Sequence, residues 1–109
     1  MAETFNKTLL SAVTSGTSEV EGMGVYDRYE GVAEWTTGVS AGVVTFEWAA
    51  DPAYAGTWEV LFTLGPPTSP PVPTHDSISV SGGYIRARIT TTVSGGTVTV
   101  SRNLQITGK

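Results

Sequence analysis

The chain of 109 residues contains no cysteine and only one histidine, His75. Without cysteine there is neither a disulfide framework nor a thiolate metal site. A single imidazole also excludes a metal centre built from several histidines. Because no covalent cross-link is available, stability has to come from core packing or from assembly. We predict no metal and no cofactor.

Basic residues are also scarce, with six Lys and Arg against ten Asp and Glu and a formal net charge of −4. Binding to a phosphate backbone requires clustered Lys and Arg, so nucleic acid is not expected as a partner. No stretch approaches the ~20 apolar residues of a membrane span, and Leu9-Leu10 is too short for the core of a secretion signal. We expect a soluble chain that does not bind membranes and is not an exported precursor.

Motifs of catalysis are missing as well. No serine lies in Gly-x-Ser-x-Gly, and the glycines do not form a phosphate-binding loop. Carboxylates are concentrated in one acidic run. This run is compatible with a catalytic pair or a Ca²⁺ site, but the favoured interpretation is a solvated face that keeps the chain soluble. This run comprises Glu19, Glu21, Asp27, Glu30 and Glu34. We predict that the protein is not an enzyme.

What the chain does contain is the alternating pattern of β-strands. In the stretch Gly83–Val100, Ile85, Ala87 and Ile89 point to one side, and Arg86 and Arg88 point to the other. Such alternation is typical of a strand with one buried and one solvated face. Because glycine accepts the positive φ of a two-residue turn, Gly95-Gly96 predicts a hairpin.

Two further segments alternate well and predict an antiparallel pair with large side chains in one core. Val44, Phe46 and Trp48 share a face in 43–48, and Trp58, Val60 and Phe62 share a face in 57–63. Additional strands are expected at 8–13, 24–29, 32–37 and 77–80, with Ile78 and Val80 inward, and around Leu104 and Ile106.

These strands predict an all-β fold in one domain, an antiparallel β-sandwich or a jelly-roll-like small barrel. Residues 1–7 are expected as a flexible N-terminal arm, and residues 8–109 as the domain. Five prolines in 65–74 exclude a central strand there and predict an exposed, extended loop.

Candidate contacts with a partner or a second copy follow from this plan. The arm and the loop can lie along a partner, and Trp35, which is out of register with Val32, is the best candidate for an exposed aromatic ring. Arg86 and Arg88 share a face and can pair with carboxylates of a neighbouring subunit. The predicted contact residues are Phe5, Leu9, Trp35, Pro66, Pro67, Pro70, Pro71, Arg86 and Arg88.

The order of the motifs from about residue 30 to 100 resembles small β-sandwich virion proteins of tailed bacteriophages. The resemblance lies in Thr-Phe-Glu at 45–47, Gly-Thr-Trp at 56–58, Ile-Arg-Ala-Arg at 85–88 and Ser-Gly-Gly-Thr-Val at 94–98. It implies a structural role without catalytic residues, on capsids, tails or fibres, often as a symmetric oligomer. Residues 1–29 match no part of this pattern.

The favoured hypothesis is therefore a capsid decoration or cement protein. It would be a small oligomer, with a trimer favoured, assembled in the host cytoplasm and bound to the major capsid protein or other virion proteins on the outer capsid surface. A tail, fibre or head-spike-base component of the virion is the alternative. A carbohydrate-binding module that uses Trp35 and a tyrosine for stacking is a further alternative.

Overall fold

A computed structural model describes residues 3–69 and 72–106 of the chain. The described part contains no helix long and apolar enough to cross a membrane. Its strands, in chain order, are β1 (Glu3–Val13), β2 (Glu21–Gly22), β3 (Arg28–Trp35), β4 (Ala41–Ala49), β5 (Glu59–Leu64), β6 (Thr74–Ser79), β7 (Tyr84–Ser94) and β8 (Val98–Ile106).

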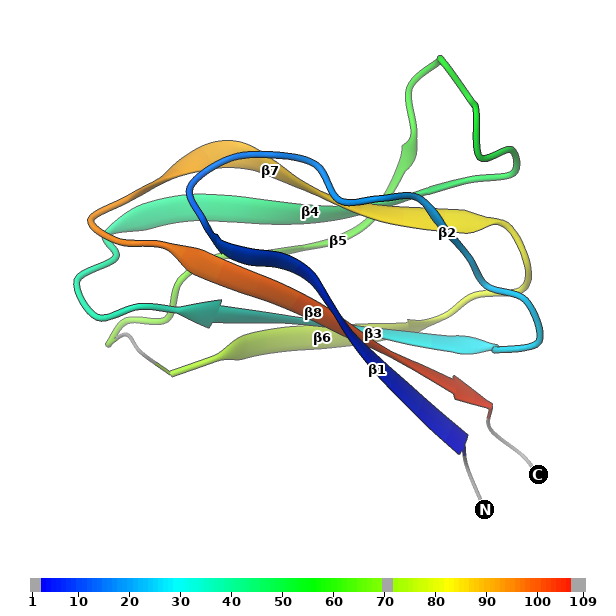
Figure 1. The fold of residues 1–109 in the computed structure, drawn as a ribbon, viewed down its shortest axis with the longest axis horizontal. Helices are drawn as coiled ribbons and strands as arrows, with labels where there is room; N and C mark the ends of the chain where they lie inside the picture. The colour runs from blue at the N-terminus through cyan, green and yellow to red at the C-terminus, as the bar shows by residue number, and fades with distance from the viewer. Residues whose placement is uncertain (1–2, 70–71, 107–109) are drawn as a thin grey trace.

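The strands form two antiparallel four-stranded sheets that pack face to face, which confirms the predicted β-sandwich (Figure 1). Sheet A has the order β1-β8-β3-β6, and sheet B has the order β2-β7-β4-β5. The pairs β4-β5, β3-β6, β2-β7 and β1-β8 are nested. The two halves of the chain therefore run alongside each other like the arms of one long hairpin. Successive strand pairs along this hairpin lie alternately in sheet B and sheet A.

The predicted hairpin at Gly95-Gly96 is wrong, although both of its strands exist. β7 lies in sheet B and β8 lies in sheet A, so the turn crosses between the sheets. It packs against the β3–β4 turn, which also crosses from one sheet to the other. A hydrogen bond joins the two turns, because Ser40 N–H donates to Ser94 O at 2.9 Å. A Cβ at Gly95 would overlap the carbonyl oxygen of Gly38. The glycines are thus required by the close approach of two crossing turns.

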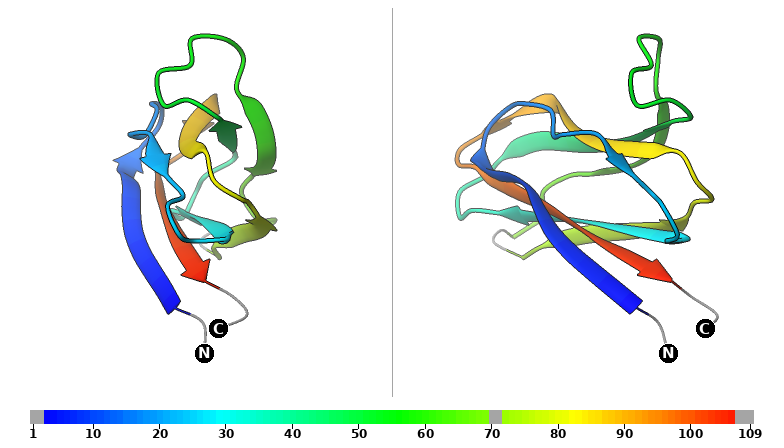
Figure 2. Two further views of the ribbon diagram at one scale, coloured as in Figure 1. Left: turned by 90° about the vertical axis from the view of Figure 1, so that its right-hand side faces the viewer. Right: turned by 45° about the vertical axis from the view of Figure 1, so that its right-hand side comes forward.

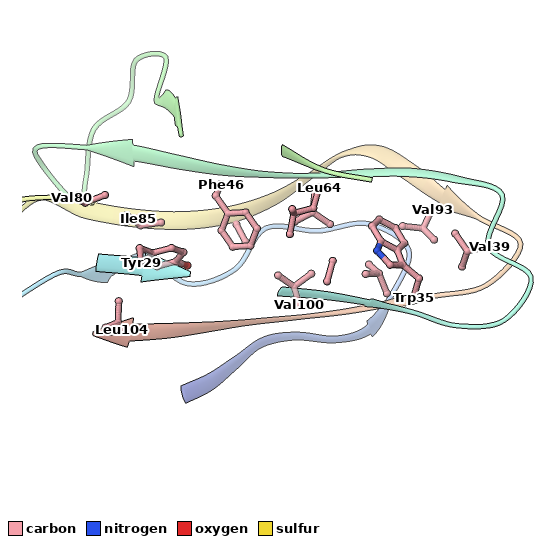
Figure 3. Packing of buried hydrophobic residues seen from close by; sticks show 14 of the residues in the cluster. Tyr29, Trp35, Val39, Phe46, Leu64, Val80, Ile85, Val93, Val100 and Leu104 are labelled. Atoms are coloured by element: carbon pink, nitrogen blue, oxygen red, sulfur yellow. The ribbon is translucent and has the colours of Figure 1, made fainter. Parts of the chain in front are cut away.

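The core lies between the sheets and is centred on Phe46 of β4 (Figure 3). The Phe46 ring contacts Tyr29 edge-on, with 5.7 Å between ring centroids, and Phe62 at 4.8 Å. Opposite it, Gly31 provides the space for the ring, because a Cβ at Gly31 would lie 2.5 Å from it. The inward positions predicted for Ile85 and Ala87 are confirmed.

Strand β5 departs from the predicted alternation because it contains a β-bulge. Phe46 pairs with Phe62, but the next residue, Glu47, pairs with Val60. A bulge inserts one residue and reverses the faces beyond it. Phe62 therefore packs against the core while Val60 is 56% exposed. The prediction that these two residues and Trp58 share the core face is wrong.

The N-terminal strand is longer than expected. Residues 3–7 pair with β8 without a break, from Glu3 with Ile106 to Lys7 with Arg102, so they belong to an edge strand and not to a flexible arm. The chain then continues from β1 along the outer edge of β7, where Ile89 N–H donates to Gly16 O at 2.9 Å. Similarly, the two strands predicted at 24–29 and 32–37 are one strand, β3.

A buried ion pair joins the two sheets. Arg102 of β8 alternates with Val100 and Leu104, faces inward and is only 2% exposed. Its guanidinium donates to both carboxylate oxygens of Glu21 in β2, at 2.7 and 2.9 Å, and Lys7 Nζ lies 3.0 Å from the same carboxylate. Burial opposes ionisation of Glu21, but the hydrogen bonds from Arg102 and Lys7 outweigh it and lower its pKa.

Replacing Gly31 by Ala should destabilise the protein by about 1–3 kcal/mol, because the new methyl group overlaps the Phe46 ring and overpacks the core. Urea unfolding measures the effect. Gly65→Ala is the matched control, since a Cβ at Gly65 meets only the Gly42 carbonyl oxygen at 3.8 Å. Equal stability of the two variants would contradict this account of the core.

Replacing Arg102 by Met should destabilise the protein by about 2–3 kcal/mol, because it leaves the Glu21 carboxylate without its buried partner. This loss is smaller than is usual when one partner of a buried ion pair is removed, since Lys7 still contacts Glu21. Adding Glu21→Leu removes the unpaired charge, so the double variant should regain most of the lost stability. Thermal and urea unfolding of the two variants and the parent check this. A double variant that is no more stable than Arg102→Met would be evidence against a charge-burial penalty.

Candidate interaction surfaces

The residues predicted to contact a partner do not form one surface. Phe5 and Leu9 lie on β1 at the edge of sheet A, whereas Arg86 and Arg88 lie on β7 in sheet B. Pro66 and Pro67 lie in the connection between β5 and β6 and are half-buried. Pro70 and Pro71 lie outside the described residues.

Trp35 is a correction, because it is buried rather than exposed, with 2% of its surface accessible. It shares the inward face of β3 with Ala33, and Val32 points outward, so the register assumed in the prediction was shifted by one residue. Its indole N–H donates to Thr74 Oγ1 at 2.9 Å, and this hydroxyl donates to Gly65 O at 3.0 Å. Trp35 thus fixes the base of the proline-rich loop and offers no stacking surface.

Arg86 and Arg88 are engaged within their own chain on the outer face of sheet B. Both contact the carboxylate of Glu47 on the neighbouring strand, Arg86 Nε at 2.9 Å and Arg88 at 2.8 Å. The Arg86 guanidinium also lies 4.3 Å from the ring centroid of Trp58, a cation–π arrangement. Glu47 is only 3% exposed although it faces away from the core. Trp58 is buried beside this network rather than in the core between the sheets.

The acidic run is divided among separate contacts. Glu21 belongs to the ion pair between the sheets, and Glu30 accepts a hydrogen bond from Asn103 at 2.8 Å and lies 3.8 Å from His75. Within residues 3–69 and 72–106, no group of three or more metal-ligating side chains is assembled.

The edge of β1 is the longest sheet edge that carries no neighbouring strand in the described structure. β1 spans 11 residues, and β8 covers only one of its sides. The pairing with β8 is regular from Glu3 to Thr8 and is then interrupted by bulges on either side of Leu10. Ala12 there has φ of +50°. Bulges blunt an edge, so the regular half, 3–8, is the part that can accept a partner strand.

A cleft lined by two aromatic side chains lies at the base of the β4–β5 loop, which projects away from the sandwich (Figures 1 and 2). This Trp48 cleft has a volume of about 290 Å³. Trp48 is only partly buried: its side chain packs against the core, as the alternation in 43–48 predicts, and part of it remains accessible. The cleft is lined by Trp48, Ala49, Ala50, Asp51, Tyr54, Thr57 and Glu59.

Sequence reasoning missed the partners of these groups, although some signals were present. Glu47 alternates with Phe46 and so predicts an outward carboxylate, but only the pairing of β4 with β7 shows that it meets two arginines. Arg102 stands in register with Val100 and Leu104, which marks it as an inward cation that requires a buried anion.

The Glu47 network should make stability depend on pH. Burial opposes ionisation of Glu47, but hydrogen bonds from Arg88 and Arg86 outweigh it and lower its pKa. The stabilisation is therefore complete above the unfolded value of about 4.3 and is lost as the pH falls through the lower folded value. Glu47→Gln should show a smaller loss of stability between about pH 5 and pH 3 than the parent. The control Glu34→Gln alters an exposed carboxylate, so its stability should fall with pH as steeply as that of the parent. If stability falls equally steeply in all three proteins, Glu47 is not the source of the pH dependence.

No family model matches the chain, and no curated protein matches its sequence. Among solved structures, the fold is similar to that of the SPBc2 prophage-derived protein YomS, with a TM-score of 0.63 and 14% sequence identity over 96% of this chain and 95% of that chain. A protein of Bacillus endospore appendages, which form a novel family of disulfide-linked pili, gives a TM-score of 0.42 and 11% identity over 98% of this chain and 88% of that chain. The chain therefore shares its β-sandwich fold with a prophage-derived protein.

Proposed function

We propose that the chain is a non-enzymatic structural protein of a bacteriophage virion, a decoration or cement protein that binds the outer capsid surface as a small oligomer. The observation that carries the proposal is the similarity to the prophage-derived YomS fold, which extends over 96% of this chain and 95% of that chain. The nested strand order also supports it, because this is the order of a jelly roll, an arrangement used by viral capsid domains.

Attachment through the edge of β1 agrees with the geometry. Residues 3–8 form a regular edge, and an extended segment of a partner can add to such an edge through backbone hydrogen bonds. The partner in this proposal is the major capsid protein or another virion protein. The half-buried Pro66 and Pro67 are a weaker candidate for the contact, because part of their surface already packs within the chain.

Binding to particles that lack the protein tests the proposal. The purified chain, labelled with a fluorophore, is incubated separately with mature heads and with isolated tails, and co-sedimentation is measured. We expect saturable binding to heads, together with a trimer by light scattering. Binding to tails alone would replace capsid decoration by the tail or fibre role, and binding to neither would refute a virion role.

A further inference from the structure

We propose that the Trp48 cleft binds a neutral sugar residue of a glycan. This inference goes beyond the virion role and does not rest on it, since it concerns a site that the isolated chain contains complete. The cleft volume of about 290 Å³ is close to the lower limit of roughly 300 Å³ for small-molecule sites. It therefore fits one sugar residue or the end of a chain, not an extended polymer.

The Trp48 ring is held in place before any ligand arrives. Its indole N–H donates to Gly82 O at 3.0 Å, and a Cβ at Gly83 would overlap the indole, so the β6–β7 turn lies directly against the ring. Because its donor is already used, Trp48 offers the cleft an apolar ring surface and no hydrogen bond. A locked aromatic surface of this kind is what the apolar face of a sugar ring requires.

The projecting loop is also fixed by its own hydrogen bonds. Asp51 accepts from Ala53 N–H at 2.8 Å, Tyr54 N–H donates to Asp51 O at 3.1 Å, and Trp58 Nε1 donates to Tyr54 O at 3.0 Å. The Tyr54 ring lies over Gly56, where a Cβ would overlap its hydroxyl end. Tyr54 is nevertheless 49% exposed. The cleft thus has a second aromatic ring on a preorganised loop, which reduces the entropic cost of binding.

The polar groups of the cleft select the ligand class. The side chains of Thr57 and Glu59 and the Tyr54 hydroxyl make no hydrogen bond or ion pair within the described residues, and none of the lining residues is basic. The carboxylates are acceptors, and the hydroxyls both donate and accept. An anionic ligand is disfavoured by the carboxylates. A polyhydroxylated ring uses the aromatic surfaces and both the donor and the acceptor of each hydroxyl, whereas an ammonium or guanidinium group, which only donates, would leave the hydroxyl donors unused.

Titration of the ¹⁵N-labelled chain tests the inference. The probes are oligosaccharides built from glucose, galactose, N-acetylglucosamine and rhamnose, with a lysine-rich peptide as the competing class. We expect at least one oligosaccharide to shift the Trp48 indole signal and the amides of 51–57, with a Kd of about 1 mM or tighter. The Trp35 indole is buried and donates to Thr74 outside the cleft, so its signal serves as an internal reference.

Variants separate the cleft from the rest of the surface. Tyr54→Ala, at an exposed loop position, should weaken binding at least about tenfold, and Glu59→Gln should weaken it measurably. Glu34→Gln, an exposed carboxylate of β3 outside the cleft, should bind like the parent. The inference is overturned if no oligosaccharide shifts these signals, if Tyr54→Ala binds as well as the parent, or if only the lysine-rich peptide binds.

Discussion

The contact between Phe46 and Gly31 is the constraint on which the rest of the sandwich depends. A phenyl ring from sheet B reaches the backbone of sheet A, because the facing position has no side chain. This brings the sheets close enough for Tyr29 of sheet A to contact the same ring edge-on. The same short separation lets Arg102 reach Glu21 in the other sheet. A wider spacing would separate the Phe46 ring from Tyr29 and the Arg102 guanidinium from Glu21.

The two buried ion-pair networks have different roles because they lie on different sides of the sheets. The pair between Arg102 and Glu21 crosses the interior and links β8 to the short strand β2. The network of Glu47 with Arg86 and Arg88 lies on the outer face of sheet B and links β4 to β7. Another strand register would leave a buried charged group without its partner in each network, Arg102 in the first and Glu47 in the second.

Much of this fold could be predicted from local patterns, and the errors have identifiable physical causes. The alternation of apolar and polar residues was sufficient to predict the inward faces of β4 and β7, where Phe46 and Ala87 are fully buried. It failed at β5, because a bulge leaves no mark in composition, and Trp58 therefore faces outward. Gly95 signalled a turn, but whether a turn pairs two strands or crosses between sheets depends on contacts distant in sequence. The Trp48 cleft depends on such contacts too, and local patterns did not predict it.

The topology separates the two surfaces for which functions are proposed. β1 and β2 lie at one side of the sandwich, and β5 and β6 lie at the other, as the end view shows (Figure 2). The edge of β1 is therefore remote from the loop that carries Tyr54. A chain held to a large partner through β1 would leave the Trp48 cleft facing solvent. Because the cleft is fixed by hydrogen bonds within β4, the adjoining loop and the β6–β7 turn, attachment does not need to reshape it. The same body can thus serve as a fixed support on one side and as a binding surface on the other.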